Sequence, residues 1–305
     1  MPNIAHDRRS FLKRSAIVAG TAALGAAAPC AAVAIDPVQR ESGEKFKFSL
    51  AAYSFRELLT GREPQMMLDD FVDVCAAMGL EGTELTSYYF PPEPTTEYLC
   101  GLKRHCFRMG LDVSGTAVGN DFCDPPGEVR RGQIEGVKRW IERASVLGAP
   151  VIRIFSGETK PHQSPEDAHR LAVEGIEECC AYAGEFGIHL ALENHGGLTT
   201  TVEGMLALVN DVQSPWFGVN LDTGNFYSDD IYGDLAKLAP YAINVQVKVA
   251  IRPGRGEPAP TDFERLASIL RDAAYRGYVV LEYEEDEDPR TACPRYMGEL
   301  RAAFA

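Results

Sequence analysis

The chain has 305 residues, and 45% of them are hydrophobic, which is enough for one large globular domain. Its formal net charge of −14 argues against nucleic acid or an anionic membrane surface as a partner, because both would be repelled. The eight cysteines form no Cys-x-x-Cys pair, which argues against a thiolate zinc site and against a disulfide framework.

The N-terminal residues have the composition of an export signal. Arg8 and Arg9 precede Ser-Phe-Leu-Lys, and an uncharged stretch rich in alanine and glycine follows and ends in Ala32-Val33-Ala34. We therefore predict a twin-arginine signal peptide over residues 1–34 and a periplasmic or otherwise extracytoplasmic protein, with no membrane association after cleavage. The alternative is a membrane anchor that is not cleaved. Residues 35–45 are expected to form a flexible leader.

Beyond residue 45, short apolar runs alternate eight times with longer amphipathic stretches. Helices are indicated by apolar stripes at a period of 3.6 residues, as in residues 64–78 and 133–147, and by cap residues such as Ser164 and Asp262. Several helices are expected to end at a glycine just before the next strand. The eight candidate strands are residues 46–53, 82–86, 112–117, 151–155, 188–193, 217–222, 242–248 and 278–282.

Eight strand–helix units with buried strands favour parallel pairing and right-handed crossovers. An open, doubly wound sheet has the same alternation, but no Gly-x-Gly-x-x-Gly follows the first strand. The sequence therefore predicts the α/β class and a (β/α)8 barrel, as a single domain over residues 46–305. The segment 250–260, after the seventh strand, is expected to be a loop.

Polar residues suited to binding a hard metal ion stand at the ends of four late strands. Glu193, Asp222 and Glu282 each follow a mostly apolar run, and Gln246 lies near the end of the seventh strand. Active sites of such barrels lie at the C-terminal ends of the strands, where these carboxylates would meet and repel one another. A divalent cation would relieve this repulsion, and oxygen ligands suit Mg²⁺ or Mn²⁺.

The motifs around these residues resemble those of the xylose-isomerase-like sugar phosphate isomerase/epimerase superfamily. They are Leu192-Glu193-Asn194-His195-Gly-Gly, Leu221-Asp222-Thr-Gly-Asn225, Gln246-Val-Lys248 and Leu281-Glu282. The resemblance implies one divalent ion, Mn²⁺ or Mg²⁺ before Zn²⁺ or Co²⁺, with Glu193, Asp222, Gln246 and Glu282 as its ligands. This sequence departs from the family pattern at Gln246 and Asn225, where the family usually has histidines, so the identity and affinity of the metal are left open.

The chemistry that the resemblance implies is proton transfer next to the carbonyl of a sugar or keto-sugar, through an enediolate. Glu193 and Glu282 would be the catalytic acid and base on opposite sides of the sugar. The candidate substrate-binding residues are His195, Lys248, Glu84, Arg153, Tyr53 and Asn225. Export makes a phosphorylated substrate the less favoured one.

Several alternatives stay open at this point. The first is a metal-dependent lyase or dehydratase acting on keto-sugars or keto-inositols, including elimination from 3-keto-glycosides, because it begins with the same proton abstraction. The second, from another class, is a carbohydrate-binding barrel without catalysis. A nuclease is disfavoured by the acidic charge and the few histidines. The oligomeric state is open, a homo-oligomer included.

Overall fold

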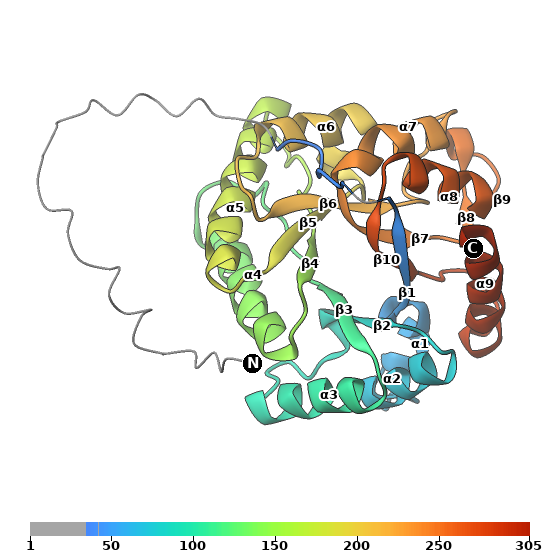
Figure 1. Ribbon diagram of the computed structural model, residues 1–305. Helices are drawn as coiled ribbons and strands as arrows, with labels where there is room; N and C mark the ends of the chain where they lie inside the picture. Colours follow the sequence, from blue (N-terminus) through green and yellow to red (C-terminus); the bar gives the residue numbers. More distant parts are fainter. Residues whose placement is uncertain (1–34, 42) are drawn as a thin grey trace, which may run out of the picture. The chain divides into compact units, whose positions relative to one another are not determined.

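In the computed structural model, which describes residues 35–41 and 43–305, eight parallel strands form a closed barrel with helices around it (Figure 1). Around the barrel the strands run in the order β1, β10, β7, β6, β5, β4, β3 and β2. The predicted single-domain (β/α)8 barrel is thereby confirmed. The strands are β1 (Lys45–Ala51), β2 (Gly82–Thr86), β3 (Asp112–Ala117), β4 (Val151–Ile154), β5 (His189–Glu193), β6 (Phe217–Asp222), β7 (Ala242–Val247) and β10 (Arg276–Leu281).

The helices lie on the outside of the barrel between successive strands, and the last one follows β10. They begin where the sequence places cap residues: the Ser164 hydroxyl accepts the Asp167 N–H at 3.0 Å, and the Asp262 carboxylate accepts the Arg265 N–H at 2.9 Å. The helices are α1 (Arg56–Leu59), α2 (Leu68–Ala77), α3 (Thr96–Arg108), α4 (Glu128–Leu147), α5 (Pro165–Glu185), α6 (Val202–Asp211), α7 (Ile231–Leu238), α8 (Phe263–Asp272) and α9 (Pro289–Phe304).

One connection differs from the sequence-based expectation. Part of the segment 250–260 is not an irregular loop, because Ala250–Ile251 (β8) and Ala259–Pro260 (β9) pair as a small antiparallel ribbon. Two-residue strands leave no alternation for a sequence pattern to show. The ribbon follows β7 directly and lies next to the C-terminal end of the barrel.

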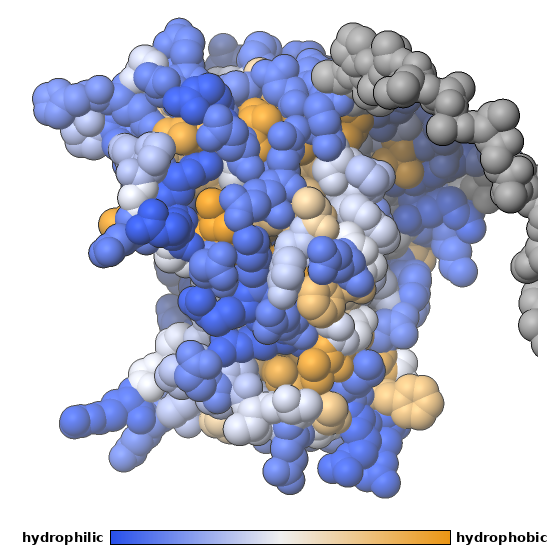
Figure 2. Space-filling model, turned by 90° about the vertical axis from the view of Figure 1, so that its left-hand side faces the viewer, coloured by the Kyte–Doolittle hydropathy of each residue, from blue (hydrophilic) through white to orange (hydrophobic). Residues whose placement is uncertain are grey.

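Alternation along the strands separates two environments. Leu192, Leu221, Val247 and Leu281 point outward and belong to the hydrophobic core between strands and helices. The residues that alternate with these along each strand point into the barrel, where many side chains are polar. The outer surface is polar again: the face in Figure 2 is mainly hydrophilic with scattered hydrophobic side chains, as expected of helices that turn their apolar stripe to the strands.

The segment that precedes β1 contacts the barrel. The Val38 N–H donates to the Pro240 carbonyl at 2.9 Å, and Arg40 Nη2 donates to the Ala242 carbonyl at 2.6 Å. The predicted signal peptide over residues 1–34 lies outside the described residues and stays a prediction. Within the described part, no helix is long and apolar enough to cross a membrane.

The cysteines of the described chain are unpaired, and only Cys100 among them is exposed. The other six are buried in the helix and strand packing, where they act as small apolar side chains. Burial raises the pKa of Cys75, Cys106 and Cys179 to about 12 in each case, so these thiols are not reactive nucleophiles at neutral pH.

Candidate active site

Polar side chains gather at the C-terminal ends of four neighbouring strands, β5, β6, β7 and β10. Glu193 and Asp222 are the last residues of β5 and β6, Lys248 follows β7, and Glu282 follows β10. All four are buried, with Asp222 0% and Lys248 7% exposed. Buried charges must be paired, so the contacts among these groups define the site.

The Lys248 ammonium lies among three carboxylates. Its Nζ is 2.5 Å from Glu282 Oε2, 2.8 Å from Glu284 Oε1 and 3.4 Å from Asp222 Oδ2. The Lys248 backbone is held on both sides, because its N–H donates to the Thr223 hydroxyl and its carbonyl accepts from the Thr261 hydroxyl. This cation therefore occupies a fixed position between the ends of β6 and β10.

A second buried cation pairs with the remaining carboxylate. Arg153 Nε on β4 is 2.8 Å from Glu193 Oε2, and the guanidinium lies over the Phe155 ring at 3.9 Å from its centroid. Asn225 Nδ2 donates to the other oxygen, Glu193 Oε1, at 2.8 Å. Glu193 thus has both oxygens engaged, one by a charge and one by a neutral amide.

Below these pairs, four side chains form a closed ring of hydrogen bonds across the inside of the barrel. Gln246 Nε2 and Asn244 Nδ2 donate to the two oxygens of Glu84 at 2.6 and 3.0 Å. Asn220 Nδ2 donates to Gln246 Oε1 at 2.6 Å and its Oδ1 accepts from Asn244 at 2.8 Å. Both ends of the Gln246 amide are therefore used inside the barrel.

Burial shifts the protonation of these carboxyl groups. It raises the pKa of Glu84 to about 7. The charge of Glu282 also raises this pKa, and the hydrogen bonds from the two amide donors lower it. Burial also raises the pKa of Asp222 to about 7, against the charge of Lys248. The pKa of Glu193 is raised well above its usual value for the same reason, with Arg153 opposing.

The two cations remain charged in this environment. Burial alone would lower the pKa of Lys248, but the charges of Asp222 and Glu282 raise it well above its usual value. Burial likewise opposes the charge on Arg153, and Glu193 is the main group that raises its pKa. Each cation is kept charged by the carboxylate with which it pairs.

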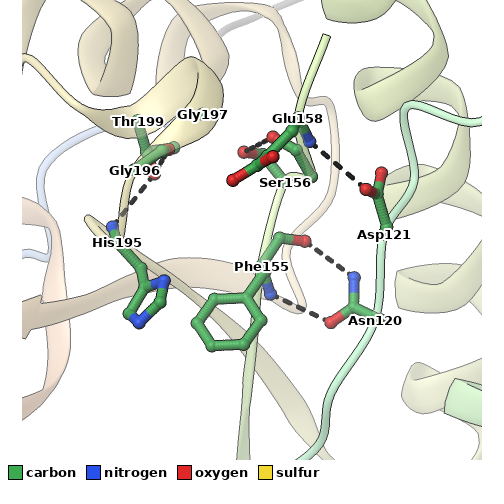
Figure 3. Close-up of a pocket in the computed structure, with 10 residues that line it drawn as sticks. Asn120, Asp121, Phe155, Ser156, Glu158, His195, Gly196, Gly197 and Thr199 are labelled. Atoms are coloured by element: carbon green, nitrogen blue, oxygen red, sulfur yellow. Dashed lines mark hydrogen bonds between the residues drawn. The ribbon is translucent and has the colours of Figure 1, made fainter. Parts of the chain in front are cut away.

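Two cavities of about 250 Å³ each open at this end of the barrel. Phe155 and His195 line the first, with their rings side by side at 4.4 Å between centroids (Figure 3). Asn120 fixes Phe155 there through two hydrogen bonds with its backbone. Lys248 and Glu282 line the second, so the ion-paired residues are accessible from it. The other residues that line it include Tyr227, Arg252, Glu284, Glu285 and Asp286.

The predicted metal ligands contact other side chains in this arrangement. Among the described residues, no group of three or more His, Cys, Asp or Glu side chains is placed so that it could hold a metal ion. Asp222 Oδ2 has no hydrogen bond, which would suit a metal ligand, but its neighbour is the Lys248 ammonium. Gln246 is bonded to Glu84 and Asn220 instead. The metal site stays a prediction.

The predicted substrate-binding residues divide into two groups. Lys248, Arg153, Asn225 and His195 lie at the site, whereas Glu84 lies inside the barrel and is 1% exposed. Tyr53 belongs to the short 3-10 helix Ala52–Phe55, which follows β1 and therefore lies at the same C-terminal end of the barrel. Its pKa is raised by burial and, to a smaller extent, by the charge of Glu284.

Three members of these networks were not predicted from the sequence: Glu284, Asn220 and Asn244. Each lies two residues from a predicted site residue, Glu282, Asp222 and Gln246 respectively. The alternation of side chains along a strand puts residues two apart on the same face, and this signal could have found them. Phe55, two residues after the predicted Tyr53, is fully buried and packs edge-on against Phe71, so it does not line the site.

A (β/α)8 barrel with ion-paired carboxylates at the C-terminal ends of its strands has the layout of a barrel enzyme. The model of the "Xylose isomerase-like TIM barrel" family matches residues 72–301. The chain belongs to this family.

Individual relatives are more distant. The chain is 25% identical over 246 residues to a protein of Homo sapiens described as a putative hydroxypyruvate isomerase, covering 70% of this chain and 83% of that protein. Among solved structures, D-psicose 3-epimerase from Clostridium cellulolyticum H10 superposes with a TM-score of 0.71 at 16% identity, covering 85% and 99% of the two chains. A probable 3-DHS dehydratase from Bacillus anthracis gives 0.62 at 19% identity, covering 84% and 98%. At these identities the structures show the shared fold.

Proposed function

We propose that the chain is an isomerase or epimerase of an uncharged sugar or keto-sugar and that it moves a proton next to the substrate's carbonyl group. One observation carries this proposal: two buried carboxylates, Glu193 and Glu282, end different strands at the C-terminal face, and each is paired with a different fixed cation. Two carboxyl groups and a positive charge are what a proton transfer through an enediolate requires. The family, which includes sugar epimerases among its structural relatives, agrees with this chemistry.

The roles follow from the contacts. In one direction, the Glu282 carboxylate takes the proton from the carbon next to the carbonyl, and the Lys248 ammonium stabilises the negative charge that develops on the carbonyl oxygen. Glu193, whose raised pKa suits a group that holds a proton, returns a proton either to the former carbonyl carbon, while the proton of the adjacent hydroxyl passes to the former carbonyl oxygen, or to the opposite face of the same carbon. The first outcome is an isomerisation and the second an epimerisation.

The charges around the cavity support a neutral substrate. The cavity at Lys248 carries Arg252 as its other basic residue, against the carboxylates Glu282, Glu284, Glu285 and Asp286. A phosphate group would meet this acidic excess and be repelled. The first cavity offers the Phe155 and His195 rings, and such apolar faces suit the C–H side of a sugar ring.

The test is to incubate the purified chain with a panel of neutral ketoses and keto-sugars in D₂O and to follow exchange and products by NMR. The proposal predicts that deuterium enters next to the carbonyl and that an isomer or epimer accumulates. Elimination of water or of an aglycone would instead assign the chain to the lyases. Saturable sugar binding without any exchange would assign it to the non-catalytic binding proteins.

A further inference from the structure

The site contains two positively charged side chains, and their summed charge equals the charge of a divalent metal ion. The predicted ligand set contains three carboxylates, Glu193, Asp222 and Glu282. Lys248 lies against two of them and Arg153 against the third. Two fixed positive charges therefore already offset the repulsion among these carboxylates, for which a divalent cation was predicted.

The position of Lys248 leaves little reason for a metal ion to enter. Its ammonium is within 3.4 Å of both Asp222 and Glu282, so a divalent ion between these carboxylates would meet a like charge at close range. The Lys248 side chain is 9% exposed and its backbone is hydrogen-bonded on both sides. Moving the ammonium away from Asp222 and Glu282 would leave it Glu284, whose side chain is 38% exposed, in place of three carboxylate partners.

The neutral member of the predicted ligand set is also engaged elsewhere. For the Gln246 oxygen to face the carboxylates, the amide would have to give up Asn220 and Glu84. Glu84 would then keep a single hydrogen bond, from Asn244, inside the barrel, and a buried carboxyl that loses a donor is destabilised. Glu193 is similarly held, with Arg153 on one oxygen and Asn225 on the other.

We propose that Lys248 and Arg153 are the resident cations of this site and that proton transfer next to the carbonyl proceeds without a divalent metal ion. This inference rests on the proposed function, because it assigns to Lys248 the stabilisation of the negatively charged oxygen of the enediolate. No group is transferred to the lysine: the proton passes between carbon and the two carboxylates, and Lys248 contributes its charge.

The first experiment uses the wild-type chain and Mn²⁺ alone. After treatment with a chelator, MnCl₂ is titrated in by calorimetry, and deuterium exchange into the ketose panel is measured with and without Mn²⁺. The inference predicts no saturable Mn²⁺ binding at micromolar concentrations and the same exchange rate in both samples. Micromolar binding of Mn²⁺, or exchange that disappears on chelation and returns with Mn²⁺, would overturn it.

The second experiment removes the cation. Lys248→Met is expected to lower the exchange rate by about 100-fold, in the range seen when one group that stabilises an oxyanion is removed. Lys237→Met is the matched control, because Lys237 is an exposed lysine of α7 paired with Asp234. Exchange by Lys248→Met at the wild-type rate would overturn the inference. If this variant does not fold, the Mn²⁺ titration of the wild-type chain still decides the matter.

The two hypotheses fail in different ways. Exchange that depends on Mn²⁺ leaves the isomerase proposal standing and overturns only the metal-free site. A chain that exchanges no ketose with or without Mn²⁺ fails the functional proposal, and the Mn²⁺ titration then still reports on the site itself.

Discussion

Gln246 lies near the end of β7 and Lys248 two residues later, just after it, yet the two side chains belong to different layers of the barrel. Gln246 completes the ring with Glu84, Asn220 and Asn244, and Lys248 pairs with the carboxylates above it. The ring joins β2, β6 and β7 through side chains, so it holds these three strands together directly below the ion pairs. A fully hydrogen-bonded polar network of this kind rigidifies its surroundings.

The protonation of Glu84 gives a prediction for stability. Its pKa is about 7 in the folded chain and near 4.5 when unfolded, so the folded chain binds one more proton between these values. Stability from this group is therefore present below pH 4.5 and is lost as the pH rises to about 7, by at most about 1.4 kcal/mol per pH unit. Urea unfolding at pH 5 and pH 7 should show this loss in the wild-type chain and a smaller one in Glu84→Gln.

The control is Glu257→Gln, which removes an exposed carboxylate from the segment between β8 and β9. It should keep the wild-type dependence on pH. An unchanged slope in Glu84→Gln would show that Glu84 keeps its charge throughout this range.

At the scale of elements, the ends of β6 and β7 approach each other closely. A Cβ placed on Gly224, just after β6, would lie 2.5 Å from Lys248 Cγ and 3.1 Å from the Ala250 carbonyl oxygen. Only a glycine lets the turn after Asp222 pass beside the lysine stem. The turn and the lysine therefore position each other.

Gly224→Ala should displace Lys248 without removing any charge. We expect a drop of about 100-fold in turnover, as for other small displacements of a reacting group, with the fold retained. Gly132→Ala is the matched control, because Gly132 lies in α4 with open space around its Cα and should tolerate a methyl group. Turnover assays and circular dichroism of both variants check this, and wild-type turnover in Gly224→Ala would contradict it.

Most of the elements could be predicted from the sequence, because local patterns define them. The strand at residues 217–222 and the cap at Ser164 follow from alternation and capping chemistry. The pairing of Lys248 with Glu282 and of Gln246 with Glu84 could not be predicted, since it depends on which side chains meet across a closed barrel. The sequence predicts that the carboxylates lie at one end of the barrel, and the structure shows which cations lie between them.

At the scale of the molecule, the acidic charge extends to the site itself. The net charge is −14, and the cavity at Lys248 has more carboxylates than basic groups. A neutral ketose should therefore bind at least about tenfold more tightly than its phosphate ester at low salt, and the difference should narrow at 0.5 M NaCl as the charges are screened. Calorimetric titrations at two salt concentrations measure this, and a preference for the phosphate ester would contradict it.

The most direct test of the two-carboxylate account compares product formation with exchange in Glu193→Gln and Glu282→Gln. For a substrate whose turnover follows the direction described, both variants should lose product formation by at least about 100-fold. Glu193→Gln should keep exchange of the substrate proton with D₂O, because Glu282 can still remove and return it on one face, while Glu282→Gln should lose exchange as well. Wild-type product formation by either variant would contradict the account.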